Sequence, residues 1–143
     1  MNWVYLFTSV HGRISRQTFL LACAALTAAE LVGQWLAYQI EGERLGIIVD
    51  LAFTYPEFML AVKRANDRNM STWILVAFFA IAVLINFFML IGWNGLADDQ
   101  NLTFSVIVYG WAIFAVVLIV ELAFRRGTVG DNRFGPDPLA AAP

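Results

Sequence analysis

The sequence predicts an all-α integral membrane protein: a four-transmembrane-helix, up-down bundle with a short N-terminal interfacial helix and both termini in the cytoplasm. Composition is the first reason, because 60% of the 143 residues are hydrophobic and only 14% are charged. A soluble domain is closer to half apolar and a quarter charged. A domain of this size could not hide so much apolar surface from water. The other two reasons are four long apolar stretches and a one-sided distribution of basic residues.

Each apolar stretch is long enough to cross a bilayer as a helix, which takes about 20 residues. The expected spans are approximately 17–40, 45–62, 72–93 and 102–124. The connections 41–44, 63–71 and 94–101 are short, so neighbouring helices must run antiparallel. We therefore expect one membrane domain over residues 1–138, followed by a disordered tail over residues 139–143.

The segment before the first span has the pattern of a helix that lies on the membrane surface. Apolar residues recur there at helical spacing, with arginines beside them: Trp3, Phe7, Val10 and Ile14, then Arg13 and Arg16. The alternative is a frayed N-terminus. No basic region precedes the apolar residues and no cleavage site follows them, so a cleaved signal peptide is not expected.

The basic residues set the predicted orientation. Those on the side of the two termini are Arg13, Arg16, Lys63, Arg64, Arg68, Arg125, Arg126 and Arg133. The opposite side carries Arg44 with four acidic residues: Glu41, Glu43, Asp98 and Asp99. Since cytoplasmic loops are rich in Lys and Arg, this distribution places both termini in the cytoplasm.

Three segments on the basic side resemble, in this order, the bacterial inner-membrane family called domain of unknown function 805, the YhaH-like proteins. The segments are 12–16 (GRISR), 63–73 (KRANDRNMSTW) and 127–138 (GTVGDNRFGPDP), of which the last is the most specific. Asn66 and Asn69 depart from the histidine and glycine that are usual in the family. The resemblance implies a small four-helix membrane protein and no particular chemistry, because the family has no established activity.

We expect these segments to meet at one membrane face and to form the candidate site. Its members are Arg13, Arg16, Arg64, Asp67, Arg68, Trp73, Asp131, Asn132, Arg133 and Asp137. One interpretation is a salt-bridged cap that holds the helix ends in register. The other is a binding site for an anionic phospholipid headgroup, which basic pockets on the cytoplasmic side can hold.

The expected pairings follow from folding the C-terminal segment back over the loop before the third span. Arg133 should meet Asp67 or an acidic lipid group. Asp131 or Asp137 should meet Arg64 or Arg68.

Polar residues inside the spans form a second candidate site, an intramembrane polar layer. At about 1.5 Å rise per residue, one member from each span falls at a similar depth: Glu30, Asp50, Asn86 and Tyr109. Glu57 lies closer to the cytoplasmic face. Such groups are costly in lipid and should face inward. The layer is either a hydrogen-bonded structural element or a proton or cation site.

Small residues recur every four positions on the first span, at Ala25, Ala29, Gly33 and Ala37. This spacing lets two helices approach closely. The partner is either another helix of the same chain or a second copy.

These patterns favour a non-catalytic membrane protein, either an accessory or scaffold subunit or a lipid-binding module. The alternative is a small transporter or channel with a cation or proton site at Glu30 and Asp50. An enzyme acting on lipid headgroups through Asp67, Arg68, Asn132 and Arg133 ranks last, because no catalytic group accompanies them. Phosphate-loop and metalloprotease motifs are absent, and no metal, cofactor or nucleic-acid partner is expected. The expected partners are the bilayer, an anionic phospholipid, and a larger membrane complex or a second copy.

Overall fold

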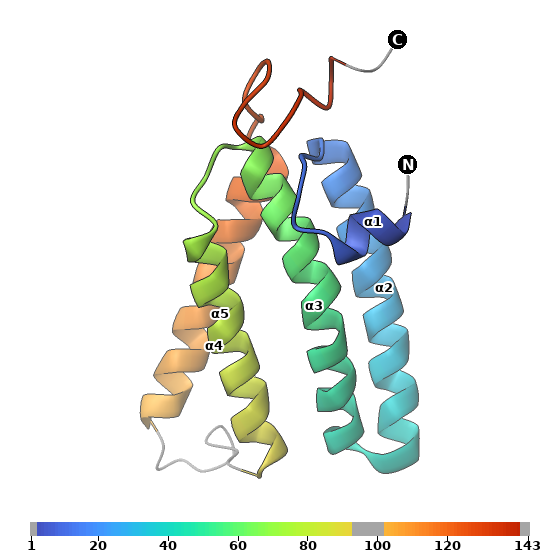
Figure 1. The fold of residues 1–143 in the computed structure, drawn as a ribbon. Coiled ribbons are helices and arrows are strands. Elements are labelled where there is room, and N and C mark those ends of the chain that lie inside the picture. Colours follow the sequence, from blue (N-terminus) through green and yellow to red (C-terminus); the bar gives the residue numbers. More distant parts are fainter. Residues whose placement is uncertain (1–2, 93–101, 141–143) are drawn as a thin grey trace.

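The computed structural model describes residues 3–92 and 102–140, and within them the chain is helical (Figure 1). The helices are α1 (Trp3–Thr8), α2 (Arg16–Glu41), α3 (Glu43–Asp67), α4 (Trp73–Leu90) and α5 (Leu102–Phe124). In the described ranges, β-type pairing is limited to an isolated bridge between Asn132 and Gly135. The expected all-α class is therefore confirmed.

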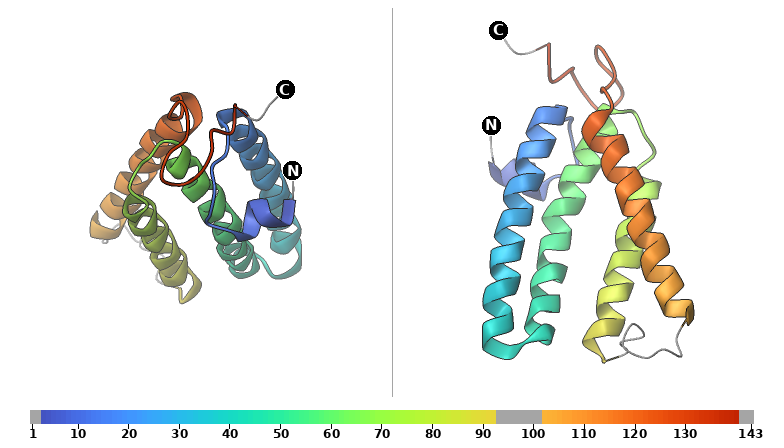
Figure 2. Two further views of the ribbon diagram at one scale, coloured as in Figure 1. Left: turned by 45° about the horizontal axis from the view of Figure 1, so that its top comes forward. Right: turned by 180° about the vertical axis from the view of Figure 1, so that it is seen from behind.

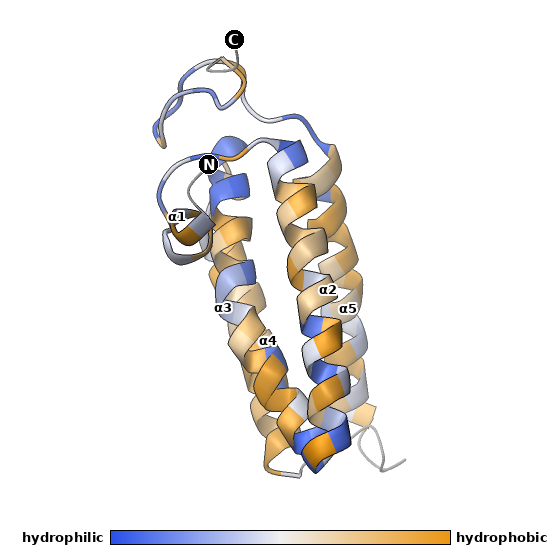
Figure 3. Cartoon of the chain, turned by 90° about the vertical axis from the view of Figure 1, so that its right-hand side faces the viewer, coloured by the Kyte–Doolittle hydropathy of each residue, from blue (hydrophilic) through white to orange (hydrophobic). Residues whose placement is uncertain are grey.

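Helices α2 to α5 are each long and apolar enough to cross a membrane. Figure 3 shows long hydrophobic stretches on these helices and hydrophilic residues gathered toward their ends. The four expected spans correspond to these helices one by one, and α5 has the expected bounds. Residue 93, the last of the third expected span, and the whole connection 94–101 lie outside the described residues.

The long helices form two pairs, α2 with α3 and α4 with α5. The pairs approach at the end where α2 and α4 begin and α3 and α5 end, and they diverge toward the other end (Figures 1 and 2). We call the first of these the capped end. The α2–α3 turn consists of Gly42 alone, which adopts a positive φ of 73° that favours glycine.

The core lies in the half of the bundle toward the capped end. Its fully buried apolar side chains come from all four long helices and include Ala22, Leu60, Leu75 and Leu122. Further along, Phe78 of α4 stacks on Trp111 of α5 at a centroid distance of 4.9 Å. The Trp111 Nε1–H also donates to the Phe78 carbonyl oxygen at 3.2 Å.

Helix α3 is longer than the expected span 45–62, because residues 63–67 continue the helix. The sequence prediction of a connection over 63–71 was wrong for this half. Charged residues lower the local hydropathy, yet Lys63, Arg64 and Asp67 are all buried here against partners from other segments. The connection is the short segment 68–72, where Asn69 adopts a positive φ of 54°.

The N-terminal helix forms, but its buried face differs from the expected one. Helix α1 ends at Thr8 and buries Leu6, whereas Trp3 is exposed. Val10 and Ile14 lie beyond the helix, and Ile14 enters the core. The helix packs against α3 (Figure 1). The apolar spacing that predicted the helix included Val10 and Ile14, but both residues lie after its end.

The small-residue stripe of α2 is partly an intramolecular seam. A Cβ atom at Gly33 would lie 3.1 Å from Cγ1 of Val49 on α3, so the two helices are in close contact there. Ala37 is buried, whereas Ala25 and Ala29 are exposed on the outside of the pair.

Candidate functional site

The capped end is organised around the last turn of α3, whose charged and polar residues contact α1, the segment before α2, the end of α5 and the C-terminal segment. The buried polar residues of the described chain all lie in this turn, at positions 63, 64, 66 and 67. We call this cluster and its direct partners the cap: Arg13, Lys63, Arg64, Asn66, Asp67, Arg68, Thr128 and Asn132.

Asp67 holds two guanidinium groups at the centre of the cap. The Arg13 Nη2 lies 3.0 Å from Asp67 Oδ1, and the Arg13 side chain is only 1% exposed. The Arg64 Nη1 pairs with Asp67 Oδ2 from within the same helix. Two guanidinium groups and one carboxylate carry a net charge of +1. Nearby carbonyl oxygens must therefore help to stabilise this buried charge.

Arg64 and Arg68 supply donors to the C-terminal carbonyls of α5. Arg64 Nε donates to the Leu122 carbonyl oxygen at 2.7 Å, and Arg68 pairs with the Glu121 carboxylate at 2.7 Å. A helix leaves its last carbonyls without intrahelical donors, and cations are favourable at that end. These arginines therefore join the end of α3 to the end of α5.

Lys63 has the same role toward α1. Its Nζ donates to the carbonyl oxygens of Tyr5 and Leu6, at 2.7 and 2.6 Å. It also lies 5.0 Å from the centre of the Tyr5 ring. Lys63 is only 1% exposed. Its charge is therefore balanced by carbonyl dipoles and an aromatic face rather than by water.

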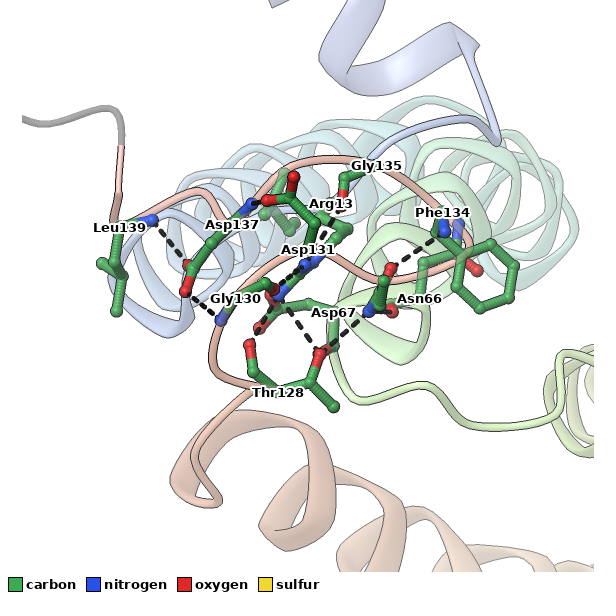
Figure 4. Close-up of polar contacts among 12 residues, drawn as sticks. Arg13, Asn66, Asp67, Thr128, Gly130, Asp131, Phe134, Gly135, Asp137 and Leu139 are labelled. Atoms are coloured by element: carbon green, nitrogen blue, oxygen red, sulfur yellow. Dashed lines mark hydrogen bonds and ion pairs between the residues drawn. The ribbon is translucent and has the colours of Figure 1, made fainter.

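The segment after α5 folds back over the end of α3, as expected (Figure 4). Thr128 donates to the Asp67 carbonyl oxygen through both its backbone N–H and its hydroxyl, each at 2.8 Å. Asn132 Nδ2 donates to the Asn66 carbonyl oxygen at 3.0 Å. Arg13 fastens the same segment, since its guanidinium donates to the carbonyl oxygens of Thr128, Gly130 and Gly135.

Beyond these contacts the C-terminal segment is closed by its own aspartates. Asp137 accepts the N–H groups of Gly130 and Leu139, at 2.8 and 2.9 Å, while its own N–H donates to Asp131. The donors on Leu139 and Gly130 hold the pKa of the Asp137 carboxyl below its usual range. Residues 141–143 of the expected disordered tail lie outside the described residues.

The expected ion pairs are corrected in detail. Asp67 pairs with Arg13 and Arg64, not with Arg133. Arg133 is exposed and lies over the ring of Phe134 at 4.6 Å. Asp131 and Asp137 are engaged by backbone N–H groups and not by Arg64 or Arg68. Arg13 and Arg133 both lie near the same membrane face, and spacing along the chain could not show which of them pairs with Asp67.

Two other predicted members lie at the edge of the site. Trp73 begins α4 and points away, with 78% of its surface exposed. Arg16 is also exposed and, among the described residues, forms no ion pair. It borders a cavity of about 680 Å³ between the start of α2 and the C-terminal segment. Arg126, Thr128 and Asp137 line the same cavity.

The intramembrane layer is assembled only in part. Asp50, Glu57 and Asn86 line a cavity of about 450 Å³ between the two helix pairs. Glu30 interacts electrostatically with Asp50 and Glu57, and it accepts a hydrogen bond from Gln34 at 3.2 Å. Tyr109 does not join them, because it is 65% exposed on the outside of α5. The rise per residue predicted the depth of Tyr109 along α5, but it did not predict which side of the helix faces the bundle.

Sequence reasoning assigned no partner to Asn66, Gly127 or Thr128, and took Gly127 only as a glycine that permits a tight turn. A side chain at Gly127 would collide with the Asp67 carboxylate, since its Cβ would lie 2.6 Å from Cγ. The sequence shows the glycine, but it does not show that Asp67 is the residue that approaches it. Within the described residues no group of three or more His, Cys, Asp or Glu side chains is placed to hold a metal ion.

A comparison with protein families finds one match: the family described as a protein of unknown function (DUF805) matches residues 7–136. The matched range contains α2 to α5 and every member of the cap. No curated protein matches the sequence, and no solved structure does.

Proposed function

Since this chain belongs to the DUF805 family of proteins of unknown function, we propose its role from its own geometry. It is a non-catalytic, multi-pass membrane protein that binds an anionic phospholipid at the capped end. That end faces the cytoplasm of an inner membrane, where the basic side of a membrane protein normally lies.

The cavity between α2 and the C-terminal segment is the observation that carries this proposal. Arg16 and Arg126 border it, and neither forms an ion pair among the described residues. The first turn of α2 also lies at its wall and carries no acidic side chain. Free cations next to a helix N-terminus suit a phosphate group. Two carboxylates also line the cavity. Asp67 is paired with Arg13 and Arg64, and both carboxylate oxygens of Asp137 accept backbone N–H groups.

The rest of the cap supports a structural and not a catalytic role. Arg13, Arg64 and Asp67 are buried, and each is engaged with several partners from other segments. A general acid, base or nucleophile must reach a substrate atom, and groups held in this way would have to leave the cap to do so. The free cations of the cavity, by contrast, stand at its open side.

The test is binding of cardiolipin to the purified protein in detergent, followed by its effect on the thermal unfolding temperature. We expect cardiolipin to raise that temperature, and phosphatidylcholine to have little effect. The double variant Arg16→Gln, Arg126→Gln should lose the increase. A matched double variant, Arg44→Gln with Arg125→Gln, removes the same charge outside the cavity and should keep it. Equal losses in both double variants would contradict a specific site.

A cation or proton transporter is the second candidate, and the cavity between the helix pairs favours it. Carboxyl groups from α2 and α3 lie near one another there, and Asn86 adds a polar group from α4. Ionisable residues inside a bundle often mark an ion pathway. In liposomes, this candidate predicts a proton or cation flux that Asp50→Asn with Glu57→Gln abolishes. A wild-type flux equal to that of empty liposomes would dismiss it.

A further inference from the structure

A second pocket lies at the capped end, on the side of α4 away from the cavity of Arg16 and Arg126. Its volume is about 410 Å³, and it is bordered by Val10, Phe58, Asn66, Thr72 and Arg133. We call it the Asn66 pocket. Its lining has no acidic side chain, and its ionisable residues are Arg133 and His11, both exposed.

Asn66 makes this pocket unusual, because half of its side-chain amide is unsatisfied. The residue is 3% exposed, and Nδ2 donates to the carbonyl oxygens of Val10 and Gly12 at 3.1 and 3.2 Å. Oδ1 is buried and accepts no hydrogen bond within the described chain. An unpaired buried acceptor is costly. A ligand with a hydroxyl group could supply the donor.

The start of α4 adds a place for a phosphate group. Thr72 caps α4 without a side-chain hydrogen bond, and the first turn contains no acidic residue. The N–H groups of Trp73 and Ile74 have no acceptor among the hydrogen bonds of the described residues, whereas the next two N–H groups reach Thr72. Free N–H groups at a helix N-terminus attract anions. Arg133 borders the same pocket and forms no ion pair with a described residue.

The third feature is the apolar wall, to which Val10, Phe58, Val62 and Phe134 contribute. Phe58 lies two turns of α3 below Asn66, toward the middle of the bundle. A ligand that fills the pocket therefore needs an apolar part that extends along α3, next to a polar headgroup.

We propose that the Asn66 pocket binds a monoanionic glycerophospholipid whose headgroup carries a hydroxyl group, as that of phosphatidylglycerol does. The phosphate lies against Arg133 and the start of α4, the headgroup hydroxyl donates to Asn66 Oδ1, and the glycerol ester region lies against Phe58 and Val62. The pocket extends the lipid-binding role proposed above to a separate site. Its selectivity does not depend on the cavity of Arg16 and Arg126.

The test compares phosphatidylglycerol with phosphatidylethanol of the same acyl chains, by titrating each into the detergent-purified protein. Both lipids carry one negative charge, but only the first has headgroup hydroxyl groups. The wild type should bind phosphatidylglycerol about fivefold more tightly, which is the effect of one net hydrogen bond. The two lipids carry equal charge, so binding through charge at the cavity of Arg16 and Arg126 contributes equally to both titrations, and the variants below assign any remaining difference to one pocket. A ratio of one in the wild type would overturn the proposal.

Two variants assign the selectivity to this pocket. Arg133→Gln removes the phosphate partner, and Val10→Trp fills the pocket from its exposed edge without removing a polar contact of a side chain. Each should bring the ratio of the two affinities close to one. Their controls, Arg44→Gln and Val116→Trp, make the same changes at exposed positions outside both lipid sites and should retain the ratio. Loss of the ratio in the controls as well would overturn the assignment.

A final titration identifies the source of the headgroup. Soluble sn-glycerol 3-phosphate offers the phosphate and hydroxyl groups without acyl chains. We expect it to leave phosphatidylglycerol binding unchanged at millimolar concentration. If it displaces the lipid completely, the pocket recognises a soluble phosphate ester and the lipid assignment is wrong. Failure of the cardiolipin experiment above would leave this affinity ratio intact, so the two proposals fail separately.

Discussion

At the scale of single residues, Arg13 joins three segments that are far apart in the sequence. Its guanidinium pairs with Asp67 at the end of α3 and donates to Thr128, Gly130 and Gly135 of the C-terminal segment. Every nitrogen of the group donates to an oxygen in a different direction. A planar fork of donors can satisfy such a set, whereas an ammonium group cannot.

The first prediction is that Arg13→Lys destabilises the protein despite keeping the charge. We expect a loss of about 2 kcal/mol in the free energy of unfolding, and about 3–5 kcal/mol for Arg13→Ala, which leaves buried groups unpaired. Arg126→Lys, at an exposed position without an ion pair, is the matched control and should be neutral. The measurement is chemical unfolding in detergent. A neutral Arg13→Lys would show that charge alone matters at this position.

Gly127 allows the C-terminal segment to approach Asp67. Arg13 and Arg64 hold the carboxylate from both sides, so it cannot move away from an added methyl group. Gly127→Ala should therefore cost about 1–3 kcal/mol, the usual range for overpacking. Gly110→Ala on α5 is the control, because no atom lies within 4 Å of its added Cβ. Equal stability of the two variants would mean that the segment shifts without cost.

Asp137 predicts a pH dependence in the acidic range. The N–H donors of Leu139 and Gly130 lower its pKa in the folded protein, so its contribution to stability is present above the unfolded value of about 3.9. That contribution is lost as the pH falls through the lowered pKa. Asp137→Asn should accordingly be less stable than the wild type at pH 7, and the difference should shrink in acid. A difference that is constant from pH 7 to pH 2.5 would contradict this assignment.

At the scale of helices, hydropathy predicted the four spans because a lipid-facing helix must be apolar over most of its length. The same measure ended the second span at residue 62, five residues before α3 ends. Hydropathy treats Lys63 and Arg64 as solvent-exposed, and it has no information on the carbonyl oxygens of α1 and α5 that surround them. For the same reason the sequence indicated that the three segments share one face but could not select Arg13 over Arg133 as the partner of Asp67.

The α2–α3 seam gives a prediction about a single helix pair. Gly33→Leu would push a large side chain against Val49, where even a Cβ atom is tight, and should cost about 1–3 kcal/mol in the free energy of unfolding. Ala25→Leu, on the exposed part of the same stripe, should leave unfolding unchanged. If the exposed alanines formed a contact between two copies, Ala25→Leu would instead change the oligomeric state, which size-exclusion chromatography with light scattering would reveal.

At the scale of the whole molecule, the ion pairs among the described residues all lie at the capped end. The cap connects α1, α3, α5 and the C-terminal segment, and the helix pairs diverge away from it (Figure 1). The polar groups of Asp50, Glu57 and Asn86 lie between the pairs. The cap therefore joins the two pairs at this end, and the cavity between them lies outside the cap.

The asymmetry of charge also determines how the molecule should insert. All basic residues except Arg44 lie in or next to the capped end, so the positive-inside rule places this end in the cytoplasm. In a Cys23→Ser background, Glu41→Cys at the opposite end should react with a membrane-impermeant maleimide in intact spheroplasts. Val129→Cys, exposed on the C-terminal segment, should react only after the membrane is permeabilised. The reverse pattern would place the cap outside the cytoplasm, where the phospholipid sites proposed for it would face the wrong leaflet.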